Sequence, residues 1–292
     1  MQFSGTYTAL VTPFLDDANQ SIDWDAFDAL VEAQVEAGAG LVPCGTTGES
    51  PTLSHEEQAA VILRAVKQAK GRVQVIAGTG SNSTRGAIDL ARAAEKAGAD
   101  AVMAVVPYYN KPTQEGLYRH YLAVAESVRC PVMIYNIPGR TGIDLQADTV
   151  ARICAAAPNV RAIKEATGNV LRAQELARVL GDRLDVLSGD DALTVAMMAV
   201  GARGVVSVTS NLFPREVARV TAAVLEGDSK KALALHLALV PVHEVMFVEA
   251  NPSPVKAALA ARGRMKNVVR LPLVPLSEPG QKKLLATLGT FA

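Results

Sequence analysis

The sequence has 292 residues, of which 49% are hydrophobic and 20% charged, and its 29 basic and 29 acidic side chains give a formal net charge of zero. It contains no basic stripe and no block of like charges, so we expect neither nucleic acid nor a membrane surface as a partner. The cysteines Cys44, Cys130 and Cys154 show neither a disulfide framework nor metal-site spacing. The N-terminus lacks a signal-peptide pattern, and no apolar run approaches the roughly 20 residues of a membrane span, which predicts a cytoplasmic protein.

Short runs rich in valine and isoleucine alternate eight times with longer amphipathic segments. Strands are predicted at 8–12, 40–43, 73–77, 101–106, 131–135, 160–164, 184–188 and 204–208. Helices are predicted near 21–37, 54–70, 84–97, 114–128, 147–156, 170–180, 192–200 and 215–226. Capping residues mark some of these helices: Ser21 or Asp23 begins the first, and Ser54 with Glu57 begins the second.

The strands are apolar almost throughout, as expected for parallel strands buried on both faces. Eight alternations predict an α/β protein with a closed (β/α)8 TIM barrel. An open doubly wound sheet would carry a GxGxxG turn after its first strand, where this chain has Thr12, Pro13 and Phe14. We assign residues 1–227 to the catalytic barrel. Residues 228–292, with helices near 230–248, 255–261 and 279–288, are assigned to a small C-terminal helical extension packed on it.

Lys164 is the most informative polar residue, because it ends the apolar sixth strand at the face where barrel enzymes carry their active sites. By position alone, a lysine there could simply reach solvent. If it projects into the barrel mouth instead, desolvation would lower its pKa and keep part of the amine neutral and nucleophilic. A neutral amine can attack a ketone to form an imine.

Other strand ends bring hydroxyls and one arginine to the same mouth. Tyr135 and Tyr109 could be ordinary core or rim aromatics, but a phenol linked to the hydroxyl of Thr46 can relay protons. The loop of residues 45–48 is too short for a phosphate-binding P-loop, although the Thr47 hydroxyl and nearby amides could bind a carboxylate. Arg140 could form a surface salt bridge or clamp a carboxylate with two hydrogen bonds.

No metal and no cofactor are expected. The histidines fall on predicted helices without the spacing of metal ligands, and Asp190 with Asp191 is interpreted as a loop feature and helix cap.

Together these residues resemble the dihydrodipicolinate synthase family, within the pyruvate-dependent class I aldolases that include N-acetylneuraminate lyase. The resemblance covers nearly the whole chain. The Gly-Thr-Thr-Gly-Glu-Ser run at 45–50, the lysine strand and the Asn-Pro-Ser-Pro-Val-Lys run at 251–256 carry it, and the Tyr-Asn-Ile-Pro-Gly-Arg-Thr-Gly run at 135–142 points to the synthases.

The resemblance implies a lyase that condenses pyruvate with aspartate 4-semialdehyde to 4-hydroxy-tetrahydrodipicolinate, on the route to diaminopimelate and lysine. Lys164 would form the imine, and Tyr135 would move protons through Thr46 and a Tyr109 contributed by a neighbouring subunit, so a homo-oligomer, a dimer of dimers, is expected. The implied substrate-binding residues are Thr47, Arg140, Val206 and Gly189.

The resemblance also implies a possible allosteric lysine pocket at Ser50, His55, Asn82 and Tyr108. Lysine-inhibited members have a His and a Glu where this chain has Gln58 and Gly86. Because loss of the carboxylate removes a charge-assisted hydrogen bond to lysine's amino group, weak or absent feedback is predicted.

Two other functional classes remain open from the sequence. One is another pyruvate-dependent aldolase, such as a 2-keto-3-deoxy sugar acid aldolase or N-acetylneuraminate lyase, which would have to accommodate a polyol. The other is a non-enzymatic paralogue that binds a keto acid, although such a protein would be expected to lose Lys164 or the hydroxyl relay. A phosphate-binding barrel is disfavoured because the loops after strands seven and eight lack a Gly-rich signature.

Overall fold

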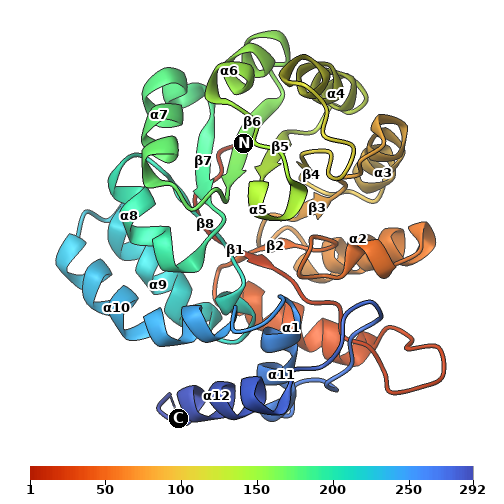
Figure 1. The fold of residues 1–292 in the computed structure, drawn as a ribbon, viewed down its shortest axis with the longest axis vertical. Coiled ribbons are helices and arrows are strands. Elements are labelled where there is room, and N and C mark those ends of the chain that lie inside the picture. Colours follow the sequence, from red (N-terminus) through yellow and green to blue (C-terminus); the bar gives the residue numbers. More distant parts are fainter. Residues whose placement is uncertain (292) are drawn as a thin grey trace.

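The computed structural model describes residues 1–291, and eight parallel strands occupy its centre (Figure 1). The strands are β1 (Gly5–Ala9), β2 (Gly40–Val42), β3 (Ile76–Gly78), β4 (Ala101–Val105), β5 (Val132–Asn136), β6 (Val160–Glu165), β7 (Asp185–Ser188) and β8 (Gly204–Ser207). Their order, β2-β1-β8-β7-β6-β5-β4-β3, is closed by a parallel bridge between Leu41 and Val75. The predicted (β/α)8 barrel is confirmed.

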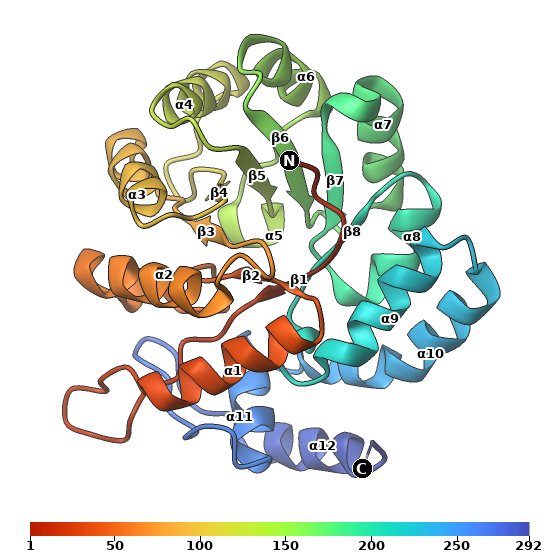
Figure 2. The same cartoon turned by 180° about the vertical axis from the view of Figure 1, so that it is seen from behind.

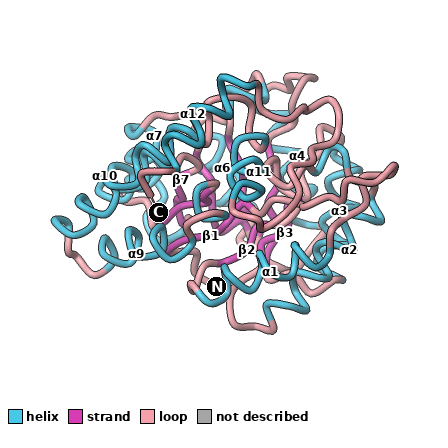
Figure 3. Tube along the Cα trace, turned by 90° about the horizontal axis from the view of Figure 1, so that it is seen from below, coloured by secondary structure: helices cyan, strands magenta, loops and turns pink. Residues whose placement is uncertain are grey.

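Helices surround the strands on every side, as Figure 3 shows in a view from below. They are α1 (Trp24–Glu36), α2 (His55–Ala69), α3 (Thr84–Lys96), α4 (Gln114–Glu126), α5 (Pro138–Thr141), α6 (Ala147–Ala156), α7 (Val170–Leu180), α8 (Thr194–Ala199), α9 (Pro214–Leu225), α10 (Ser229–Val245), α11 (Ser253–Ala261) and α12 (Glu278–Leu288). Short 3-10 turns lie at Ser50–Thr52, Gly181–Arg183, Asp191–Leu193 and Thr209–Asn211. None of the described helices is long and apolar enough to cross a membrane.

Local capping explains where the first helices begin. The Asp23 side chain accepts a hydrogen bond from the Ala26 amide at the start of α1, so Asp23 rather than Ser21 is the cap. Ser54 and Glu57 form the predicted capping box on α2.

The prediction for the first strand was wrong by three residues, because pairing with β2 and β8 ends at Ala9. The Leu10 amide still donates to the Val42 carbonyl oxygen, but the next amide, that of Val11, donates to the side chain of Asn211 instead.

The barrel interior is filled by a cluster of its own, separate from the layer between strands and helices. Phe3 closes this interior at the end where the strands begin. Its side chain is fully buried, and its amide donates to the Asp185 carboxylate at 2.8 Å. The N-terminus accordingly lies over the centre of the barrel in Figure 2. Because Phe3 fills the end at which the strands begin, a substrate can enter only at the opposite end, the mouth formed by the carboxyl ends of the strands.

After α9 the chain forms three helices, α10, α11 and α12, which Figure 1 shows beside α9 and α1. Their apolar side chains share one buried cluster with barrel residues; its members include Val11, Leu30, Leu212, Val242, Val255 and Leu284. The observed helices lie within a few residues of the predicted ones. The division of the chain at residue 227 stays a prediction.

Gly204 provides a test of barrel closure. A Cβ atom on Gly204 would lie 2.0 Å from the Gly5 carbonyl oxygen, which is backbone and cannot rotate away. We expect Gly204→Ala to lower the free energy of unfolding by about 1–3 kcal/mol or more, because β8 and β1 must separate. Gly139→Ala is the control, since no atom lies within 4 Å of its added Cβ. Equal thermal unfolding midpoints for the two variants would contradict the observed packing.

Candidate active site

Lys164 and Tyr135 lie side by side at the barrel mouth. They are paired in the β5–β6 ladder, and the Lys164 Nζ atom lies 4.2 Å from the centre of the Tyr135 ring. Lys164 is 6% exposed and Tyr135 is 5% exposed. The interpretation of Lys164 as a solvent-exposed lysine is therefore wrong: its amine is held inside the barrel.

Burial shifts the pKa of Lys164 down from 10.5 to about 8, with the Asp191 carboxylate opposing this shift and the Arg140 guanidinium adding to it. Among residues 1–291, the other buried lysine, Lys256, has a salt-bridge partner in Glu49, whereas Lys164 has none. A pKa near 8 leaves on the order of a tenth of the amine neutral at pH 7. The Lys164 side chain can therefore act as a nucleophile at neutral pH.

The Tyr135 phenol and the Thr46 side chain line the same small cavity. Burial raises the pKa of Tyr135 to about 12, while the charge of Arg140 and the nearby Thr46 hydroxyl pull it down. The phenol is thus protonated at neutral pH and has a hydroxyl neighbour, which are the two requirements for passing a proton along a short chain.

Thr47, Val206 and Gly189 complete the mouth on other strand ends. Thr47 is buried, and its hydroxyl accepts a hydrogen bond from the Asn251 side-chain amide at 3.0 Å. Val206 belongs to the interior cluster that contains Tyr135. The Gly189 amide donates to the Glu165 carbonyl oxygen at 2.8 Å, which joins it to the end of β6.

Tyr109 does not reach Lys164 within this chain. It is 87% exposed, and its φ of 72° is in the left-handed region that non-glycine residues seldom adopt. A single chain therefore leaves the predicted relay incomplete, and the contribution of Tyr109 to a neighbouring subunit's site stays a prediction.

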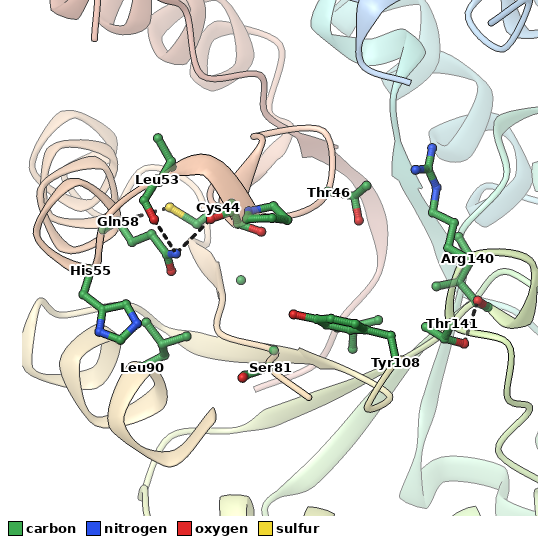
Figure 4. A pocket seen from close by; sticks show the side chains of 16 residues that line it. Cys44, Thr46, Leu53, His55, Gln58, Ser81, Leu90, Tyr108, Arg140 and Thr141 are labelled. Carbon is green, nitrogen blue, oxygen red and sulfur yellow. Dashed lines mark hydrogen bonds between the residues drawn. The ribbon is translucent and has the colours of Figure 1, made fainter. Parts of the chain in front are cut away.

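Beside the mouth lies a pocket of about 350 Å³ that contains three of the four residues predicted for an allosteric site. Ser50, His55 and Tyr108 line it, together with Gln58, whereas Asn82 does not. In Figure 4, Tyr108 lies between Arg140 and Thr141 on one side and His55 and Gln58 on the other. Because Thr46 and Arg140 also line the pocket, it is continuous with the barrel mouth.

Asp190 caps the turn after β7, as predicted, because its carboxylate accepts a hydrogen bond from the Ala192 amide at 2.9 Å. Within residues 1–291, His, Cys, Asp and Glu side chains form no group of three that could hold a metal ion.

A closed parallel barrel with a desolvated amine and a phenol at its mouth defines a class of barrel enzyme that performs its chemistry there. A profile of the Dihydrodipicolinate synthetase family matches residues 2–290. This chain belongs to that family, which confirms the resemblance and the prediction of an enzyme.

Individual relatives agree with the family profile over almost the whole chain. The sequence is 62% identical to the 4-hydroxy-tetrahydrodipicolinate synthase of Sorangium cellulosum, covering 97% of this chain and 94% of that one. It is 50% identical to the synthase of the same name from Geobacter sulfurreducens, covering 99% of each. The crystal structure of dihydrodipicolinate synthase from Aquifex aeolicus superposes with a TM-score of 0.96 at 46% identity, covering 99% of this chain and 98% of that one.

Sequence reasoning assigned no role to Asn251, Lys256 or Glu49, although all three are buried near the mouth. Asn251 contacts Thr47, and Lys256 binds Glu49, which follows the two threonines in the β2 loop. The available signal was a pair of polar residues flanking Pro252 and Pro254 in an otherwise apolar segment.

Replacing Lys164 by methionine is expected to stabilise the protein. The native state holds a charged amine in a buried site below pH 8, whereas the unfolded chain holds it in water with a pKa near 10.5. Lys164→Met should raise the free energy of unfolding at pH 7 by about 3 kcal/mol. This increase in the free energy of unfolding should shrink as pH rises from about 8 to 10.5. Over that range the amine of the native protein has lost its proton, whereas the amine of the unfolded chain still carries one.

Urea unfolding at pH 7 and pH 10 measures this difference. Lys230→Ala, at an exposed position on α10, is the control and should change stability little at either pH. A destabilised Lys164→Met protein at pH 7 would show that the amine is well solvated or paired in the native state.

Proposed function

We propose that this chain catalyses the reaction after which its relatives are named, the condensation of pyruvate with aspartate 4-semialdehyde to 4-hydroxy-tetrahydrodipicolinate. The observation that carries the proposal is the buried Lys164 amine beside Tyr135, in a chain 62% identical to a named synthase. The following roles of individual residues are part of the proposal.

The reaction begins at the Lys164 amine. Neutral Lys164 attacks the keto carbon of pyruvate, and loss of one water gives a protonated imine on Nζ. The Thr47 hydroxyl and the backbone at Val206 hold the pyruvate carboxylate, because both lie at the one mouth where the strands end. Gly189, whose amide is bound to the Glu165 carbonyl oxygen, lines the same site and leaves room for the substrate. The protonated imine acts as an electron sink, so the pyruvate methyl group loses a proton to give an enamine.

Protons move through Tyr135. The phenol, protonated at neutral pH, donates to the departing hydroxyl during imine formation. Its oxygen then accepts the proton that the pyruvate methyl group loses, and the Thr46 hydroxyl links it to further proton donors and acceptors. Tyr109 of a second copy would complete this chain of hydroxyls, which makes a homo-oligomer, with the dimer of dimers as the assembly, part of the proposal. The 87% exposure of Tyr109 supports it, because the side chain is free to enter a neighbouring molecule.

The second substrate arrives at the exposed side of the mouth. Arg140 binds the carboxylate of aspartate 4-semialdehyde with two parallel hydrogen bonds, while the enamine carbon attacks the aldehyde carbon. The aldehyde oxygen takes a proton from the Tyr135 phenol and becomes the 4-hydroxyl group. The amino group of the same substrate then attacks the imine carbon and displaces Lys164, which closes the ring and regenerates the free amine.

The three cysteines form no disulfide, and two of them are buried, which agrees with a reducing compartment. A cytoplasmic location is therefore part of the proposal.

A coupled assay tests the function directly. Purified protein with pyruvate and aspartate 4-semialdehyde, coupled to dihydrodipicolinate reductase, should consume NADPH. Lys164→Ala should lower turnover by roughly three orders of magnitude or more, because the covalent nucleophile is lost. Lys230→Ala should keep wild-type turnover. Absence of wild-type turnover with an active coupling enzyme, together with a pyruvate adduct on Lys164 after borohydride reduction, would favour a sugar-acid aldolase.

Feedback by lysine is expected to be weak or absent. The Gln58 amide already donates to the backbone of Ser50 and Leu53, and Gly86 supplies no side chain. Calorimetric titration and turnover with added lysine measure this. The Gly86→Glu variant should bind lysine more tightly than wild type, since it adds a carboxylate next to Ser81, which lines the pocket. The Ser81 side chain must shift slightly, because the added Cβ would lie 3.0 Å from its Oγ. Inhibition of the wild-type protein by sub-millimolar lysine would overturn the prediction.

A further inference from the structure

A buried ion pair joins the C-terminal segment to the loop after β2. The Lys256 Nζ atom lies 2.5 Å from a Glu49 carboxylate oxygen, both side chains are 0% exposed, and the residues are 207 positions apart in the sequence. The second carboxylate oxygen accepts a hydrogen bond from the Arg270 amide at 2.9 Å. Both oxygens of Glu49 are therefore held by the C-terminal part of the chain.

An aromatic ring supports the cations around this carboxylate. The Lys256 Nζ and the Arg270 guanidinium carbon each lie 4.2 Å from the centre of the Phe14 ring. The Arg270 guanidinium also donates to both carboxylate oxygens of Glu57, at 2.7 and 2.8 Å. The Phe14 ring therefore contacts both cations that lie beside Glu49.

The loop that Glu49 anchors carries Thr46 and Thr47. Glu49 adopts a left-handed conformation with φ of 54°, and its amide donates to the Thr46 carbonyl oxygen at 3.0 Å. A non-glycine residue in this conformation costs on the order of 1 kcal/mol and persists only where surrounding contacts impose it. The contacts of the Glu49 carboxylate are such contacts, so its position and those of the two threonine side chains are coupled.

The same C-terminal segment touches the mouth at a second point. The Asn251 side-chain amide donates to the Thr47 hydroxyl at 3.0 Å, and the Asn251 carbonyl oxygen accepts from Arg140 at 3.3 Å. Thr47 and Arg140 are the side chains to which the proposed function assigns the two substrate carboxylates. The segment around Asn251 and Lys256 therefore contacts both sides of the substrate site.

Stability alone is a weak reason for such a pair. Moving two charges out of water costs so much that well-packed apolar residues at such sites are often neutral or stabilising in comparison. A hydrogen-bonded ion pair, unlike an apolar contact, fixes the distance between its two side chains and their relative orientation.

We propose that the Lys256–Glu49 ion pair is a positioning device that holds Thr46 and Thr47 in the geometry needed for pyruvate. This inference rests on the proposed function. Lys256 and Glu49 touch no substrate in it; they act through the β2 loop.

Trapping of the pyruvate imine with borohydride, quantified by mass spectrometry across a range of pyruvate concentrations, tests the proposal. Lys256→Met should raise the half-saturating pyruvate concentration roughly ten-fold, because small displacements of positioning groups carry losses up to about 100-fold. The double variant Lys256→Met with Glu49→Gln removes both charges. It should unfold near the wild-type temperature, since no unpaired buried charge remains, yet retain the weakened affinity for pyruvate.

Asp185→Asn is the matched control. Asp185 forms a largely buried ion pair with Arg203 at 2.9 Å, at the opposite end of the barrel. This variant should lose thermal stability and keep its pyruvate half-saturation within about two-fold of wild type. If Lys256→Met fails to fold, the double variant decides the question alone.

Two outcomes would count against different claims. Wild-type affinity for pyruvate in the double variant would overturn the positioning role, because stability and affinity would then have recovered together. Absence of any pyruvate adduct in the wild-type protein would instead overturn the proposed function, whatever the variants show.

Discussion

Closure of the eight-stranded barrel is the constraint from which the other features follow. Parallel strands that close on themselves send all their carboxyl ends to one mouth, so side chains from β2, β5, β6 and β8 meet although they are distant in the sequence. Closure also fills the interior with apolar side chains and removes water from around any amine placed there. The depressed pKa of Lys164 is therefore a consequence of the barrel itself, modulated by Asp191 and Arg140.

The two buried lysines, Lys164 and Lys256, lie in similar surroundings but have different roles. Each Nζ lies 4.2 Å from the centre of an aromatic ring, and burial lowers each pKa to about 8. The Lys256 amine forms a direct ion pair with the Glu49 carboxylate. Lys164 has no such partner and is affected only by the charge of Asp191 at a greater distance. The ion pair fixes the Lys256 amine in place, whereas the Lys164 amine, which has no ion pair, is available as a nucleophile.

The C-terminal segment contacts the β2 loop at two points. The helices bury apolar side chains against the loops of β1 and β8. Asn251, in the turn before α11, contacts Thr47, and Lys256 on α11 contacts Glu49. The segment after α9 thus shapes the site from outside the barrel, which is why the barrel strands alone do not account for the placement of Thr46 and Thr47.

Sequence alone determined the features that depend on local patterns. Alternating apolar runs and amphipathic segments specify the eight strand and helix pairs, the Ser54 cap marks the start of α2, and Lys164 is placed at a strand end. The choice of Asp23 over Ser21 as the cap of α1 came from the structure. Tertiary structure decided features that depend on partners distant in the chain. The limits of β1 follow from pairing with two other strands, and the Lys256–Glu49 contact spans 207 positions. Such pairings are invisible to local periodicity, because only folding brings their members together and removes the water between them.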